Sequence, residues 1–173
     1  MIGPKPQMVM PVRSLLILLL VALNTGCDQL SKEVVRQELS YTDNIKIFTD
    51  HITLMKVENS GAFLSVGTAL PASIKFILLT LLPVLVLGAA MYGLLVKTQI
   101  PKLIVIGTSF LIGGGIGNLF DRLRYGSVTD FLHIDFGIFQ TGVFNLADVS
   151  IMIGLSLILL QAYVLNNLKK LEA

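Results

Sequence analysis

Charged residues are scarce in this chain: Asp, Glu, Lys and Arg together make up 14% of its 173 residues. Soluble globular domains usually carry about 25% charged residues. Hydrophobic residues account for 54% of the chain, and the mean hydropathy is +0.79. This composition excludes an ordinary soluble domain and predicts a membrane protein.

Cysteine and histidine are also rare, which excludes several kinds of site. The single cysteine, Cys27, cannot form an intramolecular disulfide and has no histidine near it for a Cys/His nucleophile. His133 and Asp135 would point to one face of a strand, but a metal site needs further ligands, and His51 is the only other histidine. We therefore expect no metal and no cofactor.

The few basic residues form no patch interleaved with aromatic residues, and the net charge is only +2. Nucleic-acid-binding domains usually show such a basic patch. We therefore expect no nucleic-acid partner.

Long uncharged runs dominate the sequence. Residues 76–96, 103–120 and 149–168 carry no charge and are each long enough to cross a bilayer. A fourth run, residues 14–27, reaches spanning length if Arg13 snorkels and Asp28 lies at the interface. We expect one membrane domain, residues 1–173, with spans at about 12–30, 73–96, 102–121 and 146–168 and outer loops at 31–72 and 122–145.

The distribution of charge predicts the orientation of these spans. The two terminal segments and the loop between the second and third spans hold six basic residues and one acidic residue, a net charge of +5. The long loop of residues 28–71 holds four basic and six acidic residues, a net charge of −2. Because short basic segments stay in the cytoplasm, both termini are predicted to be cytoplasmic and the two long loops to lie outside.

The outer loops contain signs of further structure. Residues 28–39 continue the helical pattern of the first span, whereas residues 45–58 are rich in β-branched residues and predict one or two strands. Residues 128–139 alternate in the same way, and a short interfacial helix is expected at 62–70. The predicted fold is an α-helical membrane protein with four transmembrane helices and a small extracytoplasmic β-sheet.

Glycines gather at the end of the third span, in the run Gly113-Gly114-Gly115-Ile116-Gly117. A phosphate-binding loop would follow a strand, and here an apolar span precedes the run. Small residues one helical turn apart allow helices to approach closely. We interpret the run as a helix-packing surface.

Cys27 raises an alternative for the first span. Basic residues, an apolar run and then Thr25-Gly26-Cys27 are typical of a lipoprotein signal peptide, which would make the chain a lipid-anchored protein. Asn24, however, occupies the position where such signals prefer Leu, and three further spans follow. An uncleaved first span is therefore favoured.

Acidic residues near the outer ends of the last two spans are the strongest candidates for chemistry. Ionisable groups at a membrane boundary are costly and usually have a function. Two carboxylates held about 3 Å apart do not both ionise readily. The ionised member then takes a proton from water while the protonated member polarises a carbonyl, which suits amide hydrolysis. The candidate acids are Asp121, Asp130, Asp135 and Asp148.

Spacing alone does not show which two acids pair. Each acid could instead balance a nearby Arg122, Arg124 or Lys32. For Asp121, which stands beside Arg122, such charge balance is the better interpretation, and Asp135 is expected to be solvated.

Other polar residues accompany these acids. Asn118 and Asn145 each stand three residues before an Asp and would hold carboxylates or contact a substrate backbone. Helix capping is the alternative, and it suits Asn145 less because this residue precedes the uncharged run by several positions. Asp28 and Lys32 have the i, i+4 spacing of a helical ion pair.

Five motifs in this order resemble lipoprotein signal peptidases, the signal peptidase II family. The resemblance covers about residues 13–168. The motifs are Asp28-Gln-x-Ser-Lys32, Asn59-x-Gly61-Ala62-Phe63, Gly117-Asn-x-x-Asp-Arg122, Val128-x-Asp130-Phe131 and Phe144-Asn-x-Ala-Asp148. The second motif is one Ala shorter than the usual pattern of the family.

The resemblance implies an aspartic endopeptidase of the bacterial cytoplasmic membrane. It would remove signal peptides from diacylglyceryl-modified prolipoproteins before the lipidated cysteine, near the outer face, with membrane lipids around it and as a monomer. By motif match the catalytic pair, with an activated water, falls on Asp130 and Asp148. The family's other characteristic positions, which shape the site or contact substrate, fall on Asp28, Lys32, Asn59, Gly61, Asn118, Asp121, Arg122, Asn145 and Ala147.

A non-enzymatic protein is the alternative from another functional class. A transporter subunit or scaffold would also place acids along a polar path through the membrane. Such a protein predicts that lipidated precursors never accumulate when it is lost.

Overall fold

Four long apolar helices form the body of the molecule. A computed structural model describes residues 10–47, 51–61 and 70–171. The helices are α1 (Met10–Glu38), a continuous helix formed by α2 (Ala72–Phe76), the π-helical η2 (Ile77–Leu81) and α3 (Leu82–Val96), then α4 (Lys102–Tyr125) and α5 (Leu146–Leu171). All four are long and apolar enough to cross a membrane, which confirms the predicted multi-pass fold.

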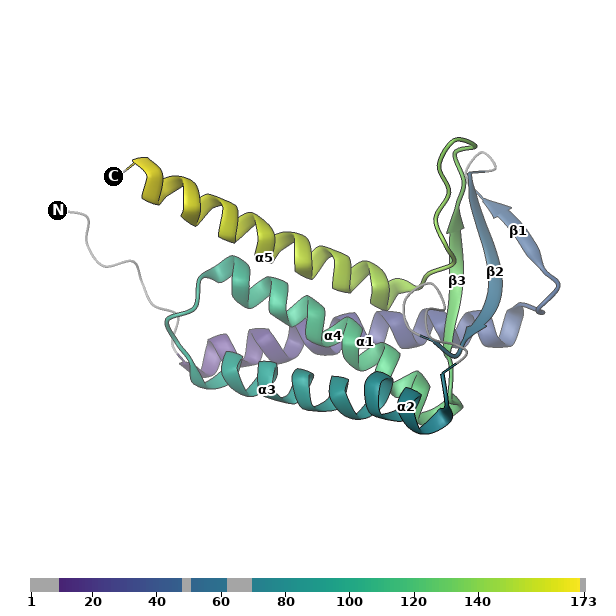
Figure 1. Cartoon of the computed structure of the whole chain (residues 1–173), viewed down its shortest axis with the longest axis horizontal. Helices are drawn as coiled ribbons and strands as arrows, with labels where there is room; N and C mark the ends of the chain where they lie inside the picture. The colour runs from purple at the N-terminus through teal and green to yellow at the C-terminus, as the bar shows by residue number, and fades with distance from the viewer. Residues whose placement is uncertain (1–9, 48–50, 62–69, 172–173) are drawn as a thin grey trace.

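The helices run side by side, and the sheet lies at one end of them (Figure 1). The start of α1, the α3–α4 connection and the end of α5 lie together at the opposite end. α1 continues to Glu38, as the sequence predicts, and so extends beside the sheet.

α4 is the central helix, and its glycines allow the close packing. A Cβ atom on Gly114 would overlap the backbone carbonyl oxygen of Ala147 in α5. A Cβ atom on Gly117 would overlap the carboxylate of Asp28 in α1. These contacts confirm the interpretation of the glycine run as a packing surface, and they bring the polar ends of α1, α4 and α5 together.

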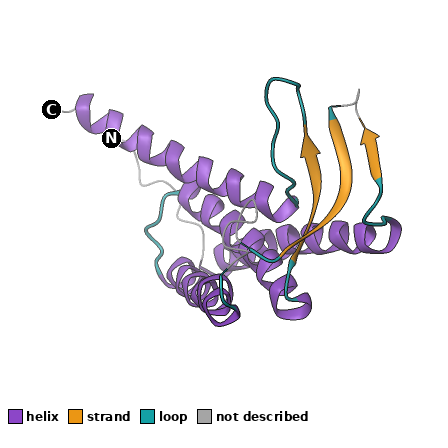
Figure 2. Ribbon diagram, turned by 45° about the vertical axis from the view of Figure 1, so that its right-hand side comes forward, coloured by secondary structure: helices purple, strands orange, loops and turns teal. Residues whose placement is uncertain are grey.

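A three-stranded antiparallel sheet of order β1-β2-β3 covers the polar end of the bundle. Its strands are β1 (Asn44–Ile47), β2 (Ile52–Asn59) and β3 (Val128–Ile134). Figure 2 shows that the strands run across the helices at this end of the bundle. β2 carries an irregularity between Leu54 and Val57, after which Val57 pairs with Asp130.

The outer segments differ from the expectation at the end of β3. The strand predicted at 128–139 ends at Ile134, because the chain turns at Gly137 (φ 80°) and returns beside β3, where Phe144 pairs with Leu132. The interfacial helix expected at 62–70 falls almost entirely outside the described residues.

Candidate active site

A cavity of about 340 Å³ lies where the sheet meets the helices. Most of its lining is apolar, but carboxylate, amide and guanidinium groups also line it, and we call it the polar cavity because of these groups. Asp130 of β3 and Asp148 of α5 both line it, although they come from different elements. The other lining residues are Asn59, Leu79, Pro83, Gly115, Asn118, Arg122, Val128, Ile151 and Met152.

Asp130 is 3% exposed and is held by two amide groups. Its Oδ1 accepts a hydrogen bond from Nδ2 of Asn145 (2.6 Å), and its Oδ2 accepts one from Nδ2 of Asn59 (3.0 Å). Burial raises the pKa of Asp130 to about 6; the bond from Asn59 opposes this rise, and the charge of Asp148 adds to it. A carboxyl group with such a pKa can hold a proton near neutral pH.

Asp148 lies in the first turn of α5 and forms a capping box with Asn145. The backbone N–H of Asp148 donates to Oδ1 of Asn145 (2.9 Å), and that of Asn145 donates to Oδ2 of Asp148 (3.3 Å). Asn145 therefore caps α5, and the expectation that capping suits it less is wrong. The reason is that α5 starts at Leu146, before the uncharged run begins. Asn145 is thus hydrogen-bonded to both Asp130 and Asp148.

Asp148 is also hydrogen-bonded to Asn118, and Lys32 fixes the orientation of that amide group. Nζ of Lys32 donates to Oδ1 of Asn118 (2.9 Å), and Nδ2 of Asn118 donates to Oδ1 of Asp148 (2.9 Å). A lysine has only donors, so the amide oxygen of Asn118 must face it and the amide nitrogen is left for Asp148.

Two further acids neutralise Lys32 in the interior. Its Nζ lies 2.8 Å from Oδ2 of Asp28 and 2.9 Å from Oδ2 of Asp121, and all three side chains are 0% exposed. The ion pair predicted between Asp28 and Lys32 is therefore present. Oδ1 of Asp28 also accepts the backbone N–H of the buried Ala147 (2.9 Å) at the start of α5, where a negative charge favours the helix dipole.

Asp121 balances basic side chains, as expected, but its neighbour Arg122 is not its ion-pair partner. Asp121 pairs instead with Lys32 and with Nη2 of Arg36 (2.8 Å). Consecutive residues of a helix point about 100° apart, so Asp121 faces α1 while Arg122 lines the cavity. Nη2 of Arg122 donates to the carbonyl oxygen of Gly61 (2.9 Å), and the N–H of Gly61 donates to Oδ1 of Asn59 (2.9 Å).

The structure thus brings the predicted site residues together at one end of the bundle, and it adds two that the sequence did not indicate. Gln29 donates to Asp28 and Asp121 (3.0 Å each). Arg36 donates to Asp121 and to Thr129, the neighbour of Asp130. Gln29 lies inside the first motif, and Arg36 lies one helical turn after Lys32. Their positions on the same helix as Asp28 and Lys32 could have indicated that they belong to the site.

Neither His133 nor Asp135 lines the polar cavity. Within the described parts of the chain, no three His, Cys, Asp or Glu side chains gather as metal ligands.

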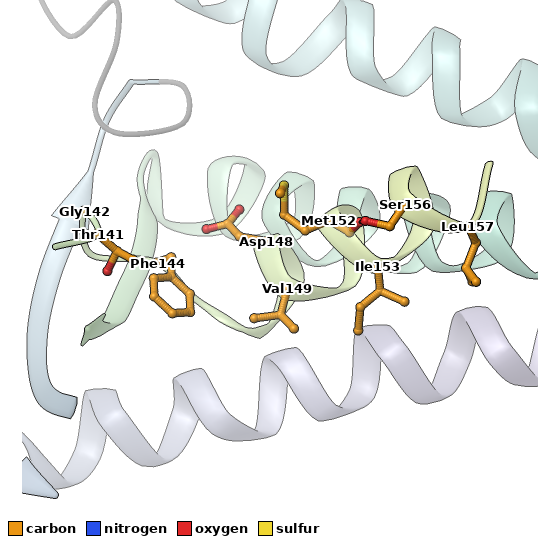
Figure 3. Close-up of a pocket in the computed structure, with 9 residues that line it drawn as sticks. All are labelled: Thr141, Gly142, Phe144, Asp148, Val149, Met152, Ile153, Ser156 and Leu157. Carbon is orange, nitrogen blue, oxygen red and sulfur yellow. The ribbon is translucent and has the colours of Figure 1, made fainter. Parts of the chain in front are cut away.

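A second cavity, of about 480 Å³, runs along α5 beside the first. It is mainly apolar and shares Asp148 and Met152 with the polar cavity. Figure 3 shows Asp148 between Phe144 at one end and Met152, Ile153 and Leu157 along the helix. Asp148 is therefore accessible both from the polar cavity and from an apolar groove.

Comparison with known proteins assigns this chain to a protein family. The sequence profile of signal peptidase (SPase) II matches residues 19–164. The chain belongs to the signal peptidase II family. It is therefore a peptidase, which argues against the transporter or scaffold alternative.

Curated relatives agree with this assignment, and a solved structure shares the fold. The lipoprotein signal peptidase of Halothermothrix orenii is 36% identical over 133 residues, which cover 77% of this chain and 85% of the relative. That of Aquifex aeolicus is 32% identical over 124 residues, covering 68% and 73%. A solved structure of a bacterial membrane enzyme shares the fold, with a TM-score of 0.74 at 23% identity and with 85% and 87% of the two chains covered.

Proposed function

We propose that this peptidase is an aspartic endopeptidase that removes signal peptides from diacylglyceryl-modified prolipoproteins by cleaving before the lipidated cysteine. The observation that carries the proposal is that Asp130 and Asp148 line one cavity and are both hydrogen-bonded to Asn145. The names of the relatives support prolipoproteins as the substrate class.

The surroundings of the two acids suggest a division of roles. Asp130, whose pKa burial raises to about 6, is the member that holds a proton and gives it to the oxygen of the scissile carbonyl. Asp148 is the ionised member and takes a proton from the water that attacks the carbonyl carbon. When the tetrahedral intermediate collapses, the C–N bond breaks and Asp148 gives that proton to the leaving amide nitrogen. One hydroxyl group of the intermediate returns its proton to Asp130, so both acids regain their starting states.

The other site residues have positioning and binding roles in this proposal. Asn59 and Asn145 hold Asp130, whereas Asn118, oriented by Lys32, holds Asp148. Asp28, Asp121 and Ala147 keep Lys32 and the start of α5 in place. Arg122 lines the cavity and donates a hydrogen bond to the carbonyl oxygen of Gly61, and both residues would contact the substrate backbone.

The membrane would contribute positioning. We place both termini in the cytoplasm and the cavity near the outer face of the bacterial cytoplasmic membrane, in a single domain that acts as a monomer without nucleic acid. The acyl chains of the substrate would then sit in the outer leaflet and fix the depth of the scissile bond. Such positioning can contribute several kcal/mol to catalysis.

A direct assay tests this function. Purified protein in lipid is incubated with a diacylglyceryl-modified precursor peptide and with the same peptide lacking the lipid. We expect cleavage before the cysteine of the lipidated peptide only. Equal cleavage of both peptides would refute the requirement for the lipid, and cleavage of neither would refute the proposed substrate.

A further inference from the structure

Three exposed apolar residues gather at the turn that follows β3. Phe136 is 57% exposed, Ile138 102% and Phe139 61%. We call residues 136–139 the hairpin tip. No ionisable residue occurs from Phe136 to Ala147. Clustered exposed apolar side chains of this kind usually mark a surface that contacts a partner or a membrane.

The tip is an ordered turn in which three backbone N–H groups are paired. The N–H of Gly137 (φ 80°) donates to Oδ1 of Asp135 (2.7 Å), and the N–H of Phe136 donates to the carbonyl oxygen of Phe139 (2.9 Å). The N–H of Ile138 donates to the carbonyl oxygen of Phe136 (3.0 Å). Hydrogen-bonded backbone can enter an apolar environment without leaving these groups unpaired.

The placement of the tip relative to the spanning helices points to its environment. The strands run across the direction of the helices, and the hairpin extends sideways past the start of α5 (Figure 1). Because the helices cross the membrane, a hairpin in this direction runs along the membrane surface, over the lipid beside α5.

The tip is also continuous with the lipid-facing side of α5. The returning segment, with Thr141, Gly142 and Phe144, lines the apolar groove together with residues of α5 (Figure 3). In that groove Met152 is 57% exposed and Ile153 41% exposed, as expected for side chains that face lipid. One apolar surface therefore runs from the spanning helix to the hairpin.

We propose that the hairpin tip inserts into the headgroup–acyl boundary of the adjacent leaflet and anchors the sheet to the membrane surface. Lipid is the occupant because the tip is uncharged, aromatic and joined to a lipid-facing surface, and aromatic residues favour this interface. This inference does not depend on the chemistry at Asp130 and Asp148.

The absence of tryptophan from the chain allows a direct test. Ile138→Trp places a single indole at the tip. The full-length variant is reconstituted into phosphatidylcholine vesicles that carry bromine at shallow or deep acyl positions, and quenching by bromine and by aqueous iodide is measured. Two matched variants calibrate the signal: Tyr163→Trp, 67% exposed within the α5 span, and Tyr41→Trp, 66% exposed after α1.

We expect shallow bromines to quench Ile138→Trp about two-fold or more, with protection from iodide, as for an interfacial residue. Tyr163→Trp should be quenched by bromine, and Tyr41→Trp by iodide alone. Two results would overturn the proposal: behaviour of Ile138→Trp like that of Tyr41→Trp, or protection from both quenchers, which would show a protein partner. If Ile138→Trp does not fold, Phe139→Trp decides by the same criteria.

Discussion

Lys32 is a fully buried cation whose three donors are all taken up by Asp28, Asp121 and Asn118. Removing one member of a buried ionic cluster leaves the others uncompensated, which usually destabilises a protein by about 3–5 kcal/mol. We expect Lys32→Met to lower the free energy of unfolding by roughly this amount, because the buried Asp28 would lose its cation and the buried Asp121 would keep only Arg36. Thermal or denaturant unfolding in detergent measures the loss.

A charge on the same helix provides the control for this variant. Glu33 is exposed, and its ion pair with Arg36 is a long contact of 3.8 Å. Glu33→Gln should change the unfolding free energy by less than about 0.5 kcal/mol. A similarly small effect of Lys32→Met would show that the cluster does not stabilise the fold.

The pKa of Asp130 sets a second expectation. Burial raises this pKa from 3.8 to about 6, so the protonated form is present below pH 6 and is lost above it. If the protonated form is needed, kcat/KM falls as the pH rises through about 6, by about tenfold per pH unit beyond. Initial rates between pH 5 and 8 check the profile, and constant activity over that range would refute the role given to Asp130.

Single-residue chemistry was partly predictable from sequence. The Asp28–Lys32 pair follows from i, i+4 spacing alone. The second partner of Asp121, Arg36, was not predicted because it lies 85 positions away along the chain and reaches Asp121 only after α1 and α4 pack. Adjacent charges in a sequence therefore say little about which charges meet in a helical bundle.

At the scale of elements, the approach of α4 to its neighbours decides where the polar residues meet. Gly114 touches the backbone of Ala147, one residue before Asp148, so an added methyl group has no flexible side chain to displace. We expect Gly114→Ala to destabilise the protein by about 1–3 kcal/mol, as overpacking does, and to reduce activity by shifting the start of α5. Unfolding and kcat/KM measure the two effects.

Gly88 in α3 provides the matched substitution. Among the described residues, no packing neighbour lies within 4 Å of the methyl group that this substitution adds. Gly88→Ala should leave activity unchanged and should not destabilise the helix, because Ala favours helix over Gly by about 1 kcal/mol. Equal behaviour of the two variants would refute a packing role for Gly114.

The elements themselves were largely predictable, and their ends were not. An apolar run long enough to span a bilayer is a strong signal, because lipid satisfies no backbone group and a helix satisfies its own. The end of β3 depends on a turn in which the side chain of Asp135 accepts the N–H of Gly137. The start of α5 depends on the capping box of Asn145 and Asp148. Both ends are determined by side-chain hydrogen bonds, which the hydrophobic pattern of the sequence does not indicate.

At the scale of the whole molecule, the distribution of charge predicts the orientation in the membrane. Thr42 lies in the turn after α1 and Thr98 in the α3–α4 connection, and both are exposed. In a Cys27→Ser background without other cysteines, a membrane-impermeant maleimide should label Thr42→Cys in intact cells. Thr98→Cys should be labelled only after permeabilisation, and the reverse pattern would refute the orientation.

The central claim is that Asp130 and Asp148 act as one catalytic pair. The most direct measurement is kcat for a lipidated precursor with Asp130→Asn, Asp148→Asn and the double variant, and with the exposed Asp135→Asn as the control. The effects of substituting residues that act as a unit are not additive. Each single substitution should therefore lower kcat by about 10²–10⁴-fold, and the double substitution should lower it little further. Asp135→Asn should keep its rate. Substantial activity in either single variant, or losses that multiply in the double variant, would contradict the pairing.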